Sequence, residues 1–310
     1  MFRTPLNSAQ RFRRIGLSIT LTDLPTTPQA SNISSGHIMR YGRRTSSRAT
    51  DSEEAATADN PATRLYIRQD LGAGMTLPLD HAQEHRLRHV LRLKAGAPVA
   101  AFNETEGEWL CRVVENGRAR FALRLEERLR AAEPESDLWL LFAPLKRARL
   151  DWLIEKAVEL GVGALLPVWT GRTQSERLNA ERLQAIAVAA AEQSERLSVP
   201  RIAPPQRLDA TLARWPPGRR LIACDESGAG VPIAEALAGL PPPGEPGEPA
   251  ALLVGPEGGF TERELDALGK LPIVTRVGLG PRVLRAETAA LAALAVFQAI
   301  AGDWRRSRTR

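Results

Sequence analysis

The chain has 310 residues, of which 43% are hydrophobic, and this is enough apolar material for one large or two smaller globular domains. Its formal net charge of +6 comes from residues 1–50, which carry eight arginines and one acid, whereas the rest of the chain is close to neutral. Net charge therefore does not indicate a nucleic-acid-binding protein, and two cysteines are too few for a disulfide framework or a cysteine metal site.

Residues 1–60 are rich in Arg, Ser and Thr and show little apolar periodicity, so we expect a disordered tail. An organelle transit peptide has a similar composition, and so does an over-extended reading frame whose true start is near Met39. No secretory signal and no apolar run of membrane-spanning length is evident. We therefore expect a cytoplasmic protein with no membrane partner. We also expect no metal, because no cysteine ligands accompany the histidines.

Residues 61–132 are expected to form a small β-barrel that carries one helix. The helix is predicted over residues 82–93, with Leu87, Val90 and Leu91 on its apolar face. The pair Asn116-Gly117 is a strong hairpin signal. Short strands with partial alternation are predicted at residues 65–67, 99–102, 109–114 and 120–125. A linker follows near residue 133, and residues 305–310 form a basic tail.

Residues 133–304 alternate strands and helices, which predicts an α/β fold with a mostly parallel sheet covered on both faces. The strands are expected at residues 138–142, 164–168 and 220–224. The helices are expected around residues 150–158 and 180–196, and in a last long helix that ends near residue 302.

Two glycine-rich turns near the C-terminus each lie between an apolar run and a helix. The first turn spans residues 255–259, and the second begins at Gly278-Leu279-Gly280. Neither has the Lys-Ser/Thr pair of a P-loop, and no third glycine completes a dinucleotide fingerprint, so these two ligand classes are not expected. Glycine here has two explanations, which are tight turns alone or backbone that must approach a ligand closely.

Two motifs at these turns carry a family resemblance. They are Leu-Val-Gly-Pro-Glu-Gly-Gly-Phe at residues 253–260 and Leu-Gly-Pro-Arg-Val-Leu-Arg-Ala-Glu-Thr-Ala at residues 279–289. With weaker matches elsewhere, the chain resembles the ribosomal RNA small subunit methyltransferase E family over about residues 64–304. After Gln193-Ser194, members of that family usually continue Gly-Arg-Asn, whereas this chain has Glu195-Arg196-Leu197.

The resemblance implies a SPOUT methyltransferase domain with a trefoil knot and a parallel sheet at residues 133–304, preceded by a PUA-like RNA-binding β-barrel at residues 61–132. It implies a homodimer that uses S-adenosylmethionine to methylate N3 of a uridine in 16S ribosomal RNA of the small subunit. Two alternatives stay open. One is another SPOUT-type RNA methyltransferase, acting on a ribose 2′-hydroxyl or another base, and the other is a non-catalytic RNA-binding protein of this fold.

The resemblance also implies three catalytic residues. Arg282 and Arg285 are expected to face the uracil carbonyls, where positive charge favours the N3 anion, or to contact a phosphate. Glu287 is expected either to order an arginine or to accept the N3 proton. An acid at the start of the last helix also has a purely structural explanation, because it interacts favourably with the helix dipole.

The remaining predicted site residues contact the cofactor or the RNA. Those expected to bind the cofactor are Leu253, Gly255, Pro256, Glu257, Gly258, Gly259, Gly278, Leu279, Gly280, Arg282, Val283, Leu284 and Thr288. Those expected to contact RNA are Arg86, Arg88, Arg92, Arg172 and Gln193. The arginines at residues 86–92 also fit a solvated helix face.

Overall fold

The computed structural model describes residues 60–117, 120–133, 137–174, 178–238 and 249–305. All of these residues belong to one unit, Thr50–Arg310. The N-terminal tail predicted at residues 1–60 and the basic tail predicted at residues 305–310 lie outside the described residues, apart from residues 60 and 305. These two predictions therefore stay predictions.

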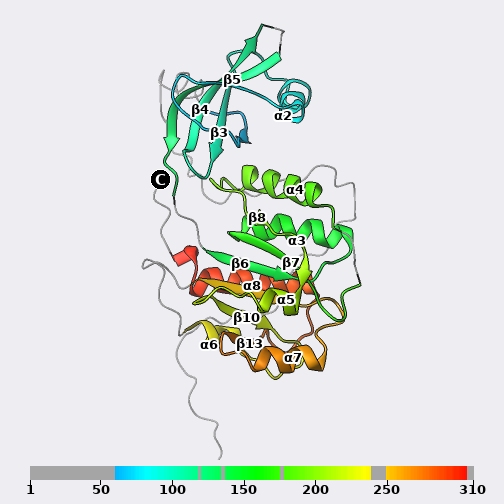
Figure 1. Ribbon diagram of the computed structural model, residues 1–310. Helices are drawn as coiled ribbons and strands as arrows, with labels where there is room; N and C mark the ends of the chain where they lie inside the picture. The colour runs from blue at the N-terminus through cyan, green and yellow to red at the C-terminus, as the bar shows by residue number, and fades with distance from the viewer. Residues whose placement is uncertain (1–59, 118–119, 134–136, 175–177, 239–248, 306–310) are drawn as a thin grey trace, which may run out of the picture. The chain divides into compact units, whose positions relative to one another are not determined.

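The first part of the described chain is built around a five-stranded sheet (Figure 1). Its strands are β1 (Arg64–Tyr66), β2 (Thr76–Pro78), β3 (Pro98–Asn103), β4 (Gly107–Asn116) and β5 (Arg120–Arg130). Their order is β1-β3-β4-β5-β2, with β1 parallel to β3 and the other neighbours antiparallel. Val99, Ala101 and Leu123 are fully buried in the core of this sheet. The four predicted strands are confirmed, and β2 is an addition.

The helix predicted over residues 82–93 is shorter than expected and changes type. It begins as α2 (His81–His85) with a capping box from Asp80, continues as a π-helical turn, η1 (Arg86–Val90), and is followed by Arg92 in a left-handed conformation (φ 54°). Leu87 is buried as expected, but Val90 is 64% exposed and Leu91 is 38% exposed. The prediction for these two side chains was wrong because a π-helical turn has a longer repeat than the α-helix that the pattern assumed.

A second, larger sheet contains the later strands, and every pairing in it is parallel. Its five longer strands are β6 (Leu138–Phe142), β7 (Ala164–Trp169), β10 (Arg220–Cys224), β12 (Ala250–Val254) and β13 (Val274–Gly278). Three two-residue strands complete it, namely β8 (Arg201–Ile202), β9 (Gln206–Arg207) and β11 (Val231–Pro232). The order is β11-β13-β10-β12-β6-β7-β8, and β9 also pairs with β7.

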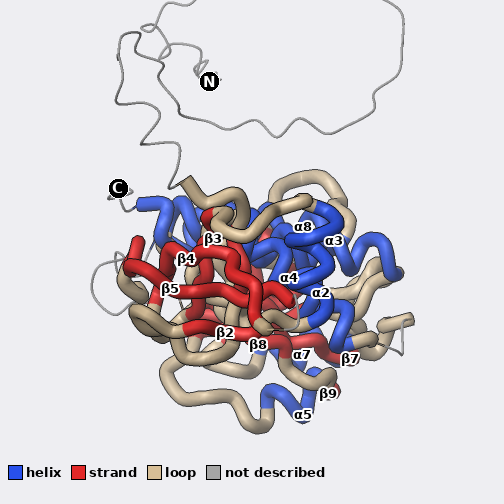
Figure 2. The backbone as a smooth tube through the Cα atoms, turned by 90° about the horizontal axis from the view of Figure 1, so that it is seen from above, coloured by secondary structure: helices blue, strands red, loops and turns tan. Residues whose placement is uncertain are grey.

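Helices cover both faces of this sheet. Successive side chains of each strand point to opposite sides, so each face has its own apolar core. Leu140 and Leu252 pack into one core beside α3 (Arg147–Glu159), α4 (Ala180–Gln193), α6 (Ile233–Ala238) and α8 (Ala286–Ile300). Leu141 and Leu253 pack into the other core beside α5 (Leu208–Leu212) and α7 (Glu262–Gly269). Helix α3 packs against both α4 and α8 (Figure 2). The predicted α/β class with a mostly parallel sheet is confirmed.

Helix α8 is a core helix of this fold. Together with the turn that follows it, residues Ala286–Arg305 are long and apolar enough to cross a membrane by length and composition alone. In the structure, however, Ala290, Ala293 and Leu294 are fully buried against the sheet and its helices. Gln298 is also fully buried, and its amide donates to the carbonyl of Leu160 (2.6 Å), so α8 is tied to the end of α3.

The turn after α4 contains a strained residue, since Glu195 has φ 62°. This is the position at which the resembling family usually has glycine. We expect Glu195→Gly to raise the free energy of unfolding by about 0.5–1 kcal/mol, because the relief of left-handed strain exceeds the extra entropy of glycine in the unfolded chain. Thermal unfolding should then shift upward by about 2 °C. Glu235→Gly, an exposed position inside α6, should instead lower the midpoint, and a decrease in both variants would contradict the assigned strain.

Candidate active site

The two glycine turns lie at the same edge of the larger sheet. They follow β12 and β13, which pair with opposite sides of β10, so the carboxyl ends of all three strands are neighbours. The loop after β10 contacts both flanking segments. The backbone amide of Asp225 donates to the carbonyl of Val277 (2.9 Å), and the carboxylate of Glu226 accepts from the amide of Phe260 (3.1 Å). Ligands of open parallel sheets bind at this carboxyl edge, so the turns form one candidate site.

An arginine that the sequence analysis missed joins the two turns. Arg149 lies in the first turn of α3, and its Nη1 donates to Oε1 of Glu257 in the first glycine turn (3.2 Å). Its Nε lies 3.5 Å from Oε1 of Glu287, just beyond the second turn. The only signal in the sequence was the presence of basic residues at the start of a helix, where the dipole disfavours positive charge.

Glu287 has an unusual environment. The residue is only 8% exposed, and its Oε2 is buried with no hydrogen-bond partner in the described part of the chain. A buried carboxylate oxygen without a partner is costly, because the water that it gives up is not replaced. Arg149 lies beside Oε1 alone, so Oε2 is the carboxylate oxygen of Glu287 that this arginine leaves unpaired.

The glycines of the first turn make room for protein atoms. A Cβ on Gly255 would lie 3.0 Å from the Phe260 ring, and a Cβ on Gly259, where φ is 67°, would lie 1.6 Å from Oε1 of Glu226. Of the two explanations for glycine, close packing within the protein is therefore sufficient at both positions. Gly258 is less restricted, since its Cβ would meet Arg172 at 3.4 Å, an ordinary contact distance.

The second turn is different, because its backbone faces open space. Gly280 has φ 96°, and a Cβ placed on it would have no atom within 4 Å. No hydrogen bond joins the backbone of residues 279–284 to any other residue that the structure describes. These amides and carbonyls are available to a ligand, and the edge of an adenine ring presents both donors and acceptors. The turn therefore fits the adenosine part of the expected cofactor.

The other predicted cofactor residues differ in how accessible their side chains are. Leu253 and Pro256 are buried, so they can meet a ligand only through their backbone. Val283 is 90% exposed. Glu257 and Thr288 are also exposed, whereas Leu279 and Leu284 are half-buried. Gly278 lies in strand β13, and its Cβ would meet only the carbonyl oxygen of Gly230, at 3.5 Å.

Arg282 and Arg285 are both exposed, and Arg285 caps α8 with extended backbone. Neither guanidinium has a hydrogen bond or ion pair to another described residue. Arg276 on β13 is different, since it donates to Oδ2 of Asp225 at 3.0 and 2.6 Å. Burial disfavours the charge on Asp225, but hydrogen bonds from Ser227 and Arg276 outweigh it and lower the pKa of Asp225. Arg276 is thus structural, whereas Arg282 and Arg285 are available to a substrate.

Other chemistry is not supported by the described residues. Burial raises the pKa of both Cys111 and Cys224 to about 12, so neither thiol is a nucleophile at neutral pH. No group of three or more His, Cys, Asp or Glu side chains is placed to hold a metal in the described ranges. An open depression of about 380 Å³ includes Arg219, Arg220 and Pro272, but it lies at the amino ends of β10 and β13, opposite the glycine turns.

The predicted RNA-binding residues fall into two groups. Arg86 pairs with Glu192, and Arg88 lies 3.5 Å from Glu84 and stacks over the Phe121 ring at 4.2 Å, so both are engaged within the protein. The others are closer to solvent. Arg92 and Gln193 are exposed, and Arg172 donates to the carbonyl of Gly258 (2.8 Å) beside the first turn. RNA contact by these five residues stays a prediction.

Known proteins are similar to this chain over most of its length. A family model described as an RNA methyltransferase domain matches residues 132–298. A Rickettsia conorii protein named ribosomal RNA small subunit methyltransferase E is 33% identical over 237 residues, which cover 75% of this chain and 93% of the relative. The chain belongs to the ribosomal RNA small subunit methyltransferase E family. A Bacillus subtilis protein of the same name is 27% identical over 237 residues, covering 74% of this chain and 92% of the relative.

Solved structures of similar proteins share the fold. A ribosomal RNA small subunit methyltransferase E from Neisseria gonorrhoeae, bound to S-adenosylmethionine, is 28% identical with a TM-score of 0.64, over 78% of this chain and 99% of its own. A Legionella pneumophila protein in complex with the same cofactor is 27% identical with a TM-score of 0.65, over 78% and 98%. The likeness covers more of this chain than residues 132–298, so it extends into the five-stranded sheet.

Proposed function

We propose that this protein transfers a methyl group from S-adenosylmethionine to N3 of a uridine in 16S ribosomal RNA of the small subunit. The single observation that carries the proposal is the Arg149 guanidinium between Glu257 and Glu287, because it joins the two family motifs in one site. The cofactor assignment is supported by the relatives solved with S-adenosylmethionine and by the unpaired backbone of residues 279–284.

The two turns divide the binding of the cofactor. The backbone of the second turn, around Gly280, would hold the adenine ring, and Glu257 and Gly258 of the first turn would hold the rest of the cofactor. When bound, S-adenosylmethionine supplies an electrophilic methyl group at this edge of the sheet. The protein has to place the uracil against that methyl group and favour the N3 anion over the neutral base.

Three side chains carry the chemistry on the uracil. Arg282 and Arg285 face its carbonyl oxygens, where their charge stabilises the negative charge that develops when N3 loses its proton. Glu287 accepts that proton, while Arg149 holds its Oε1. From the sequence, Glu287 had two possible roles, which were to order an arginine or to accept the proton. In this arrangement it does both, and the arginine is Arg149.

Gly280→Ala is expected to weaken S-adenosylmethionine binding by roughly 10- to 100-fold, because left-handed strain would displace the turn and the new methyl group would enter the space of the ligand. Calorimetric titration measures this. Gly218→Ala is the matched control, since Gly218 has φ 79° and equally open space but lies away from the turns. Equal affinity in both variants would refute the placement of the cofactor at Gly280.

The fold and the assembly follow the family in this proposal. The trefoil knot is part of the proposal because the family resemblance implies it. The five-stranded sheet is assigned as a PUA-like RNA-binding domain at residues 61–132, before the methyltransferase domain at residues 133–304. Exposed Trp152 and Val283 are candidates for the interface of a homodimer. The protein would act in the cytoplasm, where the small subunit is found.

The non-catalytic alternative is separated from the proposed enzyme by two measurements on the full-length protein. Calorimetry with S-adenosylmethionine and transfer of label to small subunits that lack the modification should both be positive for the proposed enzyme. Cofactor binding without transfer to any RNA would support the non-catalytic RNA-binding protein.

A further inference from the structure

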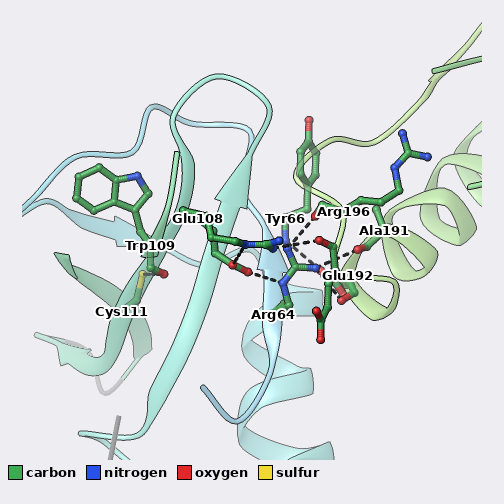
Figure 3. Close-up of polar contacts among 10 residues, drawn as sticks. Arg64, Tyr66, Glu108, Trp109, Cys111, Ala191, Glu192 and Arg196 are labelled. Atoms are coloured by element: carbon green, nitrogen blue, oxygen red, sulfur yellow. Dashed lines mark hydrogen bonds and ion pairs between the residues drawn. The ribbon is translucent and has the colours of Figure 1, made fainter. Parts of the chain in front are cut away.

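Arg64 of β1 inserts into the end of helix α4 (Figure 3). Its Nη1 donates to the carbonyls of Ala191 (3.1 Å) and Glu192 (3.0 Å), and its Nη2 donates to the carbonyl of Arg196 (2.7 Å). Its Nε pairs with the carboxylate of Glu108 on β4, and the side chain is only 13% exposed. The last carbonyls of a helix have no partner within the helix, so Arg64 caps α4 from more than 120 residues away in the sequence.

The contact is reciprocal, because α4 also sends a charge to the five-stranded sheet. The Glu192 carboxylate accepts from the backbone amide of Tyr66 (3.1 Å) and pairs with Arg86 Nη1. Its side chain is only 7% exposed. We call Arg64, Tyr66, Arg86, Glu108 and Glu192 the sheet–helix clamp. Arg64 of the sheet binds α4, and Glu192 of α4 binds the sheet. Together these charged hydrogen bonds fix both the distance and the orientation between the sheet and the helix.

The sheet–helix clamp is connected to the candidate active site through Arg196 and helix α3. The carbonyl of Arg196 accepts from Arg64. The guanidinium of Arg196 donates to the backbone carbonyls of Val158 (2.7 Å) and Val162 (3.1 Å) at the end of α3. The other end of α3 carries Arg149, which contacts Glu257 and Glu287. The clamp is therefore linked through one helix to both glycine turns.

We propose that Arg64 is a positioning residue for the RNA reaction, and that the sheet–helix clamp holds the RNA-binding surface of the five-stranded sheet at a fixed place relative to the methyl-donor turns. This inference rests on the proposed function. When an RNA binds the five-stranded sheet, its target base then lies close to Arg282 and Arg285. The free energy of RNA binding at the sheet is therefore used to position the base for the reaction. Only an RNA large enough to contact both regions gains from the clamp.

The test compares two substrates in the full-length protein. The first is the small subunit lacking the modification, and the second is a short oligouridylate that reaches only the active site. For Arg64→Ala we expect kcat/KM on subunits to fall by about 100-fold, while kcat/KM on the oligonucleotide and the S-adenosylmethionine affinity stay unchanged. Glu192→Gln, which is almost isosteric, should give a smaller loss of the same pattern and carries the test if Arg64→Ala does not fold.

Arg207→Ala is the control, because this arginine is 75% exposed and pairs only with nearby Asp209 among the described residues. It should leave both substrates unaffected. A loss of equal size on both substrates would show damage to the catalytic domain and overturn the inference, and so would normal kinetics on both. A wild-type protein that binds the cofactor but modifies neither RNA would overturn the proposed function itself.

Discussion

An Arg285→Ala variant is expected to lose about 100- to 1000-fold in kcat for methyl transfer while it keeps its affinity for S-adenosylmethionine. Arg285 is exposed, and its side chain has no partner among the described residues, so its removal should change the free energy of unfolding by no more than about 0.5 kcal/mol. The loss would appear in the transition state, where the guanidinium faces the negative charge that develops on the uracil.

The measurement for Arg285 is a pair of experiments, steady-state methyl transfer to small subunits and calorimetric titration of the cofactor. Arg263→Ala is the matched control, because Arg263 is also an exposed arginine at the start of a helix, α7, and should leave both quantities unchanged. Arg285→Lys keeps the charge without the planar fork and should recover part of the rate. Equal losses in kcat and in cofactor affinity would instead assign Arg285 to cofactor binding.

A Glu287→Gln variant is expected to lose at least about 100-fold in kcat, because the amide cannot accept the N3 proton. The amide is almost isosteric with the carboxylate, so the packing of this 8% exposed residue should be preserved. The affinity for S-adenosylmethionine should stay close to that of the wild type. Single-turnover transfer measures the chemical step directly and separates it from product release.

Glu257→Gln is the comparison for Glu287→Gln, since both carboxylates contact Arg149. Glu257 is exposed in the first turn, so its variant should raise KM for the cofactor with a smaller effect on kcat. If Glu287→Gln transfers the methyl group at a near-normal rate, the only remaining explanation for Glu287 is the favourable interaction of an acid with the start of α8. Glu287 would then be a structural residue, and the proton acceptor would lie elsewhere.

Local patterns in the sequence were enough to predict most of the fold. Continuous apolar runs such as residues 138–142 and 164–168 predict buried parallel strands, because both faces of such strands are covered. The strands that were missed, β2, β8, β9 and β11, are two or three residues long and exist only because a neighbouring strand pairs with them. The π-helical turn after His85 also has no signature in a pattern that assumes 3.6 residues per turn.

The candidate site was predicted only where its residues are close in the sequence. The two glycine turns were found from their motifs, and the parallel pairing of β12 and β13 with β10 then brings them to one edge. Arg149 was missed because it meets Glu257 from 108 residues away, and the pairing of Arg86 with Glu192 spans 106 residues. Such contacts are set by how helices pack on the sheet, which no local pattern encodes.

The most direct test of the proposed function is to identify the nucleoside that this protein methylates. Small subunits that lack the modification would be incubated with the full-length protein and S-adenosylmethionine carrying a labelled methyl group, then digested to nucleosides and separated. We predict one labelled product, N3-methyluridine, from a single position in 16S ribosomal RNA. Label in a 2′-O-methylated nucleoside or in another base would contradict the account, and so would the absence of transfer by a protein that binds the cofactor.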